Sequence, residues 1–409
     1  MLHHVDNLPI EQLRSWDLGA HVDGFSKHLK ERGYPQGRAR IFLLAAAHLL
    51  RFLQNNEIAI ESLGQKVFER FRQHLLHCGC RKPTGGRGKD ARNGARAFFE
   101  YLRDLGIVRA IDEGKPALPP MVQCFRHWLK QHRGAADSTL KLYSQGAVQL
   151  VAALGDDPSQ YDARTLRAFV SERARHSGRG ATQALIKALR SFLRYLATER
   201  KCSTALEKAV PTIAGWRLSS LPRYLTDSEL NRTIDACDME TRQGVRDRAV
   251  LLLLVRLGLR ASDVAALRLC DLDWQNATVA VSGKSRREAR LPLPQEVGDA
   301  VLQYLESRPE LDTEGVFLRL PAPRQPLSSR GVSTIAFRAM RRAGVSVPRG
   351  AHILRHTAAT QMLRRGVSLD AIRTLLRHRS VDTTTTYAKV DLELLQQVAQ
   401  PWPEVLRCS

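Results

Sequence analysis

Apolar residues recur at helical spacing through most of the first 200 positions. The blocks ARAFFEYLRDLGI, at Ala95–Ile107, and ALRSFLRYLATER, at Ala188–Arg200, each place apolar side chains three and four residues apart. That spacing lines one face of an amphipathic helix. The shorter segments Phe25–Gly33 and Phe125–Arg133 also resemble each other, at a similar offset of about 100 residues. We interpret the two regions as a diverged duplication of a small helical domain. The alternative is that short amphipathic helices resemble each other by chance.

The last third of the chain has a mixed pattern. The sequence TDSE at Thr226–Glu229 has the spacing of a capping box and predicts a helix start. Strands are predicted at Thr278–Val281 and Ala289–Pro294, joined by the hairpin turn SGKSRRE, and a third short strand at Val316–Leu320. Helices are predicted around residues 248–257, 328–343, 351–365 and 369–376.

Two polar, proline-containing stretches, Asp112–Pro120 and Val210–Pro222, read as linkers. They predict three domains: an N-terminal helical domain at 1–112, a second helical domain at 116–208, and a mixed α/β domain at 221–409. The expected fold class is therefore mainly α with a small β-hairpin or sheet.

The net charge of the chain limits the kinds of partner that it is expected to bind. The 409 residues include 63 Lys and Arg against 41 Asp and Glu, a formal net charge of +22. So large an excess points to a polyanion, nucleic acid or less often an anionic membrane surface. The apolar runs Ile41–Leu50 and Ala249–Val255 are shorter than the roughly 20 residues of a membrane span. The N-terminus lacks the pattern of a signal peptide, and seven irregularly spaced cysteines fit a reducing, cytoplasmic location.

One set of residues in the last 150 positions suggests phosphoryl chemistry. Two arginines, a lysine in the hairpin turn, two histidines and a tyrosine would form a cationic pocket without a carboxylate partner: Arg260, Lys284, His352, Arg355, His378 and Tyr387. Preorganised cations stabilise the charge that spreads over phosphate oxygens in a transition state. A tyrosine hydroxyl becomes a nucleophile when cations stabilise its anion or a base takes its proton.

This ordered set resembles the tyrosine recombinase (phage-integrase-type) family. The elements G-x-R, a hairpin lysine, H-x-L-R-H-T, a further histidine and a later tyrosine occur in order between about Leu221 and Val390. The resemblance implies a mixed α/β catalytic domain and one or two helical, SAM-like DNA-binding domains. It also implies a site-specific DNA recombinase or integrase, of a phage or another mobile element, that needs no metal, ATP or other cofactor.

The resemblance also implies a role for each residue. Tyr387 attacks the scissile phosphate and forms a 3′-phosphotyrosyl link, while Arg260 and Arg355 hold the nonbridging oxygens. Lys284 protonates the leaving 5′ oxygen. His352 assists proton transfer, and His378 completes the phosphate-binding set. Strands then exchange through a Holliday junction.

Two positions depart from the family pattern. Asp263 stands where the family usually has Glu, and Arg377 stands where it commonly has Gly. The sequence leaves Arg377 with two interpretations, a DNA contact or a solvated helix end. Arg286 and Arg287 lie close to Lys284 in the same turn, and His356 is interpreted as structural.

Basic residues on the predicted helices are candidates for DNA contact. They comprise a stripe on the second helical domain together with three isolated positions: Lys187, Arg190, Arg194, Lys141, Arg38 and Arg40. A stripe at helical spacing suits the phosphate backbone or a groove. The alternative is a solvated basic face. The role of the first domain stays open between DNA arm binding, an extended clamp and assembly.

The sequence HLLHCGC places His74, His77, Cys78 and Cys80 close together. No second ligand pair follows at zinc-finger spacing, and one residue rather than two to four separates the cysteines. A helix C-terminus with a glycine stop explains the segment better, so no metal is predicted.

The expected partner is double-stranded DNA, bound by a homo-oligomer that is a dimer on one site and a tetramer in synapsis, with or without partner recombinases. A tail helix after Tyr387 would dock on its own domain or on a neighbouring protomer. Localisation would be cytoplasmic, at the nucleoid in a prokaryote. The alternative functions are a type IB topoisomerase and a catalytically silent DNA-binding accessory protein.

Overall fold

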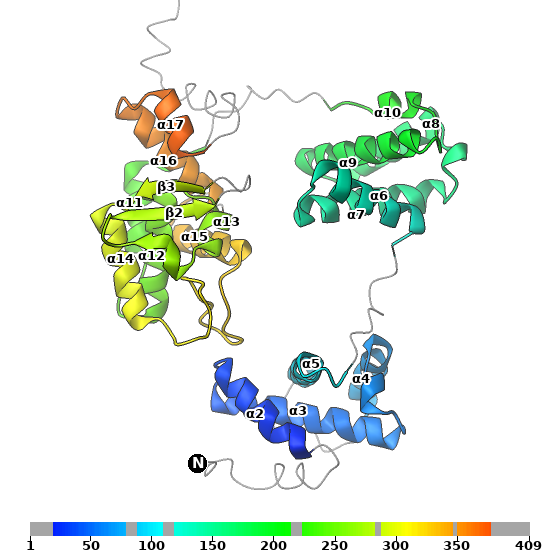
Figure 1. The fold of residues 1–409 in the computed structure, drawn as a ribbon, viewed down its shortest axis with the longest axis horizontal. Helices are drawn as coiled ribbons and strands as arrows, with labels where there is room; N and C mark the ends of the chain where they lie inside the picture. The colour runs from blue at the N-terminus through cyan, green and yellow to red at the C-terminus, as the bar shows by residue number, and fades with distance from the viewer. Residues whose placement is uncertain are drawn as a thin grey trace, which may run out of the picture. The chain divides into compact units, whose positions relative to one another are not determined.

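The computed structural model describes residues 19–78, 88–108, 118–213, 223–282, 288–346 and 350–377. The chain divides into two compact units. One comprises Met1–Ile60, His74–Ile107 and Leu218–Ser409, and the other comprises Glu61–Gln73 and Val108–Arg217. Figure 1 shows the helices and the small sheet.

The N-terminal helices are α2 (Gly19–Glu31), α3 (Gln36–Asn55), α4 (Gln65–His77) and α5 (Gly88–Asp104), with a 3₁₀ turn at Ile60–Ser62. Helices α3 and α5 pack closely at Gly94, where an added Cβ would lie 2.6 Å from the Cβ of Ala45. The buried side chains Phe25, Leu49 and Phe98 form the centre of this packing.

The second unit contains α6 (Pro120–Arg133), α7 (Asp137–Leu154), α8 (Ala163–His176), α9 (Arg179–Thr198) and α10 (Ala205–Ala209). Helices α7 and α9 meet at a small residue as well, since a Cβ on Gly146 would lie 2.8 Å from the Cβ of Ala188. Asp162 caps α8 by accepting bonds from the backbone N–H groups of Arg164 and Thr165.

The same arrangement of aromatic rings occurs in both helical regions. The ring centroids of Phe25 and Phe98 lie 5.0 Å apart, and those of Phe25 and Tyr101 lie 5.5 Å apart. The second region repeats both values, 5.0 Å for Phe125–Phe192 and 5.5 Å for Phe125–Tyr195. A duplication predicts this equivalence, whereas chance similarity of short helices does not.

The last part of the chain begins with α11 (Asp227–Asp235), whose predicted capping box between Thr226 and Glu229 is present. The other helices are α12 (Arg242–Arg256), α13 (Ala261–Ala266), α14 (Gln295–Ser307), α15 (Ser329–Arg342), α16 (His352–Arg364) and α17 (Leu369–Leu375). Helix α12 forms the centre of the core, because Ala249–Val255 are at most 2% exposed. It packs against α14, α15 and α16.

The sheet is small and antiparallel, with the order β1-β2-β3. The predicted hairpin is confirmed as β2 (Thr278–Ser282) and β3 (Glu288–Pro292), with Val279 opposite Leu291. The observed fold is therefore mainly α with a small sheet, as the sequence predicts.

The prediction of a strand at Val316–Leu320 is wrong. The third strand is β1 (Leu272–Asp273), which pairs with β2. Leu318 forms only an isolated bridge with Pro326, and its N–H donates to the Tyr304 hydroxyl at 3.0 Å. The apolar run arises because Val316, Phe317 and Leu318 are all buried in the core, at most 2% exposed.

Among the helices that the structure describes, none is both long and apolar enough to cross a membrane.

Candidate active site

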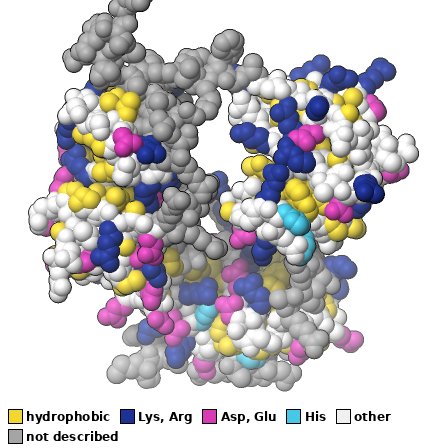
Figure 2. All heavy atoms as spheres, turned by 45° about the horizontal axis from the view of Figure 1, so that its top comes forward, with side chains coloured by type: hydrophobic (Ala, Val, Ile, Leu, Met, Phe, Trp, Pro, Cys, Tyr) yellow, Lys and Arg dark blue, Asp and Glu magenta, His cyan; other side chains and the backbone are white. Residues whose placement is uncertain are grey.

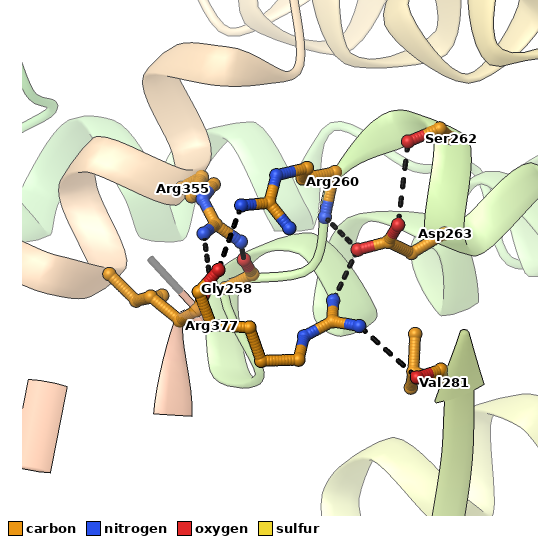
Figure 3. Close-up of polar contacts among 8 residues, drawn as sticks. Gly258, Arg260, Ser262, Asp263, Val281, Arg355 and Arg377 are labelled. Carbon is orange, nitrogen blue, oxygen red and sulfur yellow. Dashed lines mark hydrogen bonds and ion pairs between the residues drawn. The ribbon is translucent and has the colours of Figure 1, made fainter. Parts of the chain in front are cut away.

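The site begins at the turn that follows α12. Gly258 has φ +58°, and an added Cβ would lie 2.5 Å from Cδ2 of Leu376. Only glycine combines this backbone conformation with so close an approach. The turn brings Arg260 to the N-terminal end of α13, directly beside the end of α17 (Figure 3).

Arg355 lies on α16 and is 2% exposed. Its guanidinium donates hydrogen bonds to the carbonyl oxygens of Gly258 and Leu376. Nη2 of Arg260 donates to the carbonyl oxygen of Arg377 at 3.2 Å. The two arginines are thus anchored to the same pair of chain turns, 258–260 and 376–377, and Figure 3 shows their guanidiniums near each other.

His352 lies one helical turn before His356 on α16, and their ring centroids are 4.3 Å apart at 70°. Partial desolvation, followed by the positive charges of Arg355 and Arg260, lowers the pKa of His352 below 6.5. Burial, His352 and Arg355 lower the pKa of His356 to about 4. Both rings are therefore neutral at pH 7, and a neutral imidazole can accept a proton.

Asp263 is 3% exposed and lies beneath this turn. Its carboxylate accepts hydrogen bonds from the Arg260 backbone N–H at 3.2 Å and from the Ser262 hydroxyl at 3.4 Å, and it forms an ion pair with Arg377. Arg377, the ion-pair partner of Asp263, is not one of the six candidate residues of the expected cationic pocket. The Asp263 carboxylate supports the backbone of Arg260 and neutralises the charge of Arg377.

Arg377 has φ +53°, a conformation that favours glycine, and this agrees with its position in the family pattern. Its side chain is 13% exposed, pairs with Asp263, and donates to the carbonyl oxygen of Val281 at 3.2 Å. The interpretation as a solvated helix end is wrong, because the guanidinium is held between α13 and β2. The sequence contains one signal of this backbone conformation, because the family pattern commonly has glycine at the position of Arg377.

The structure brings together three of the six catalytic candidates: Arg260, His352 and Arg355. The other three, Lys284, His378 and Tyr387, lie outside the described residues, as does the tail after Tyr387. Lys284 belongs to the connection between β2 and β3, and His378 directly follows Arg377 in the sequence.

Two of the three DNA-contact candidates on α9 have intramolecular partners. Arg190 donates to the Val210 carbonyl at 3.0 Å and to the Thr212 hydroxyl at 2.8 Å. Nε of Arg194 donates to Glu207 at 3.1 Å, which joins α9 to α10. These contacts hold the segment after α9 against that helix.

The other four candidates for DNA contact differ in their contacts and exposure. Arg38 pairs with Asp90 at 3.1 Å, whereas Arg40, Lys141 and Lys187 are exposed. Figure 2 shows Lys and Arg side chains spread over the face in view, with acidic side chains among them.

Known proteins resemble this chain in sequence. The model of the phage integrase family matches residues 223–393. A putative integrase/recombinase, y4rA, of Sinorhizobium fredii is 33% identical over 94% of this chain and 95% of its own length. Tyrosine recombinase XerC of Thermodesulfovibrio yellowstonii is 29% identical over 67% of this chain and 93% of its own.

Solved structures agree on the fold. XerH site-specific recombinase bound to palindromic difH substrate aligns with TM-score 0.56 and 18% identity, over 82% of this chain and 95% of XerH. A lambda integrase dimer bound to a COC′ core site aligns with TM-score 0.53 and 19% identity, over 65% of this chain and 93% of that one. The family model and these relatives show a DNA strand-cleaving and rejoining enzyme. The chain belongs to the phage integrase family of tyrosine recombinases.

Proposed function

We propose that this chain is a site-specific recombinase of a mobile element, and that Tyr387 is its nucleophile. The convergence of Arg260 and Arg355 on the turns 258–260 and 376–377, with the His352 ring close enough for both charges to lower its pKa, carries the proposal. A guanidinium presents five N–H donors in a planar fork that matches the geometry of phosphate oxygens. Two guanidiniums suit the nonbridging oxygens of one phosphodiester.

In the proposed reaction the Tyr387 hydroxyl oxygen attacks the phosphorus and loses its proton to the neutral ring of His352. The phosphorus–O5′ bond breaks, and Lys284 donates a proton to the leaving 5′ oxygen. Arg260, Arg355 and His378 stabilise the charge on the phosphate. Attack by the 5′-hydroxyl of a partner strand releases Tyr387 and exchanges strands through a Holliday junction. The phosphotyrosyl bond conserves the phosphodiester energy, so the cycle balances without ATP.

The proposed domains are 1–112, 116–208 and 221–409. The repeated ring geometry at Phe25 and Phe125 supports a duplicated core-binding domain in the first two. Both would contact double-stranded DNA, the second through exposed Lys187 and Lys141. We further propose a dimer on each site, a tetramer in synapsis, and a cytoplasmic, nucleoid-associated location.

A suicide substrate tests the activity. Cognate DNA with a nick beside the scissile phosphate should trap an SDS-resistant protein–DNA adduct in the unaltered protein and none in Tyr387→Phe. Adduct formation undiminished in Tyr387→Phe would overturn the assignment of the nucleophile. The Tyr304→Phe variant is the matched control, because that hydroxyl bonds only within the core, at 3.0 Å from the Leu318 nitrogen.

The two alternative functions predict different results in DNA assays with the same protein. A type IB topoisomerase would relax supercoiled plasmid that lacks the specific site, and a silent accessory protein would bind DNA without forming an adduct. We expect strand exchange that requires two sites.

A further inference from the structure

Three potential metal ligands meet where α3 passes the C-terminal end of α4. Nε2 of His48 lies 3.2 Å from Nε2 of His74, and 3.9 Å from Sγ of Cys78. All three ligand atoms lie within 4.8 Å of one another. None of these residues belongs to the proposed catalytic set.

These separations fit one tetrahedral ion. Zinc binds imidazole nitrogen at about 2.0 Å and thiolate sulfur at about 2.3 Å, and the tetrahedral angle then separates two such nitrogens by about 3.3 Å and a nitrogen from a sulfur by about 3.5 Å. The observed 3.2 Å and 3.9 Å lie close to those values. Two nitrogens and one sulfur are also the donor types that zinc prefers.

A single hydrogen bond explains the convergence less well. Nε2 of a neutral imidazole is either one donor or one acceptor. Here Nε2 of His48 faces both His74 and Cys78, and it can satisfy only one of them in either tautomer. A metal ion at the common centre is shared by all three atoms.

The helices hold the three side chains in place. The N–H of Cys78 bonds to the carbonyl oxygen of His74 at 2.8 Å, so the two ligands lie one turn apart on the same face. His48 is 9% exposed, and the ring of Phe52 packs 5.1 Å from that of His74. His77, three residues after His74, is exposed.

The second helical region provides an internal comparison. The Gly94–Ala45 contact between α3 and α5 corresponds to the Ala188–Gly146 contact between α9 and α7. In that alignment Gln149 stands at the position of His48. The histidine is therefore not required by the packing of the repeated fold.

We propose that His48, His74 and Cys78 bind one divalent zinc ion that fastens the end of α4 to α3. The sequence alone argued against a metal, because it considered only ligands within HLLHCGC; His48 comes from a helix 26 residues earlier. Cys80 lies outside the described residues and is not part of the proposed site. The ion has a structural role, so the proposal does not depend on strand cleavage.

The test uses the full chain, purified under reducing conditions and analysed for metal content by mass spectrometry. We expect one zinc ion per chain in the unaltered protein, and loss of that zinc in His48→Gln, His74→Gln and Cys78→Ser. His77→Gln and Cys124→Ser are matched controls on exposed positions and should keep the zinc. Zinc retained in all three ligand variants would overturn the proposal.

A second measurement covers the case in which a ligand variant fails to fold. The unaltered protein is treated with a chelator, and cobalt(II) replaces the zinc. We expect a lower melting temperature after chelation, its recovery on adding Zn²⁺, and a thiolate-to-cobalt absorption band. A protein without bound metal, whose melting temperature responds neither to chelator nor to Zn²⁺, would show that the three side chains only hydrogen-bond.

Discussion

The guanidinium of Arg377 forms a buried ion pair with the carboxylate of Asp263, across 114 residues of sequence. The pair joins the segment after α17 to the first turn of α13. Because the Arg377 carbonyl also accepts a bond from Arg260, the pair fixes the backbone that positions a proposed catalytic arginine. Arg377 is therefore a positioning residue that occupies the place of a glycine.

Two substitutions of Arg377 should separate the stabilisation by its ion pair from the strain of its left-handed backbone. Arg377→Ala leaves Asp263 with its charge buried, which costs about 3 kcal/mol of unfolding free energy. Arg377→Gly loses the same pair but relieves the left-handed backbone, so it should be about 1 kcal/mol more stable than Arg377→Ala. Urea denaturation measures both.

The cleavage assay separates a positioning role of Arg377 from a merely structural one, because a structural role alone would leave the cleavage rate of the folded protein unchanged. We expect the single-turnover rate on the suicide substrate to fall in Arg377→Gly at temperatures where the variant is fully folded. An unchanged rate would contradict a positioning role. Arg373→Ala, which removes an exposed pair with Asp370 and keeps a good helix former in α17, is the comparison for general effects near this segment.

Gly258→Ala should strongly destabilise the catalytic part. The new Cβ combines positive φ, at about 1 kcal/mol, with overlap on Leu376, at about 1–3 kcal/mol. Gly366→Ala is the matched control, since it has φ +79° and no atom within 4 Å of its added Cβ. It should lose only about 1 kcal/mol. Equal losses in the two variants, measured by thermal or urea unfolding, would show that contact with Leu376 is unimportant.

Stability should fall as the pH is lowered from 7 towards 4. The pKa of His356 is about 4 in the folded chain, against 6.5 for a free histidine side chain, so the unfolded chain binds more protons across this interval. The contribution of His356 is complete above pH 6.5 and is lost as the pH falls through its folded pKa. After discounting for partial exposure, it amounts to about 2 kcal/mol.

Urea unfolding at several pH values measures this dependence. His356→Gln should have a shallower slope between pH 6.5 and 4 than the unaltered protein. His127→Gln, on an exposed position of α6, should keep the original slope. Two other histidines with lowered pKa values, His28 and His352, act in the same direction and will leave part of the slope in His356→Gln.

DNA binding should distinguish two basic residues on α9. Lys187 is exposed, so Lys187→Ala should weaken binding at all sequences and reduce the slope of log K against log salt concentration by about 1. Arg190 is held by Val210 and Thr212, so Arg190→Ala should change that slope less. Fluorescence anisotropy at several salt concentrations measures both. A larger slope change for Arg190→Ala would mean that it leaves its partners to reach a phosphate.

Short-range patterns in the sequence are enough to predict the local elements and the chemical type of the site. The capping box at Thr226, the hairpin and the helices α15 to α17 follow from short-range spacing, because helix caps and strand alternation depend on neighbouring residues. The ordered arginines, histidines and tyrosine placed the chain in its family before any coordinates.

Which distant side chains meet depends on the packing of the folded chain. Val316–Leu320 has the composition of a strand, but its burial comes from α14 and the core rather than from a sheet. Arg377 finds Asp263 and the Val281 carbonyl 114 and 96 residues away, and His48 finds His74 across 26 residues. Such contacts depend on how helices pack, and no local pattern encodes which distant side chain a buried polar group will reach.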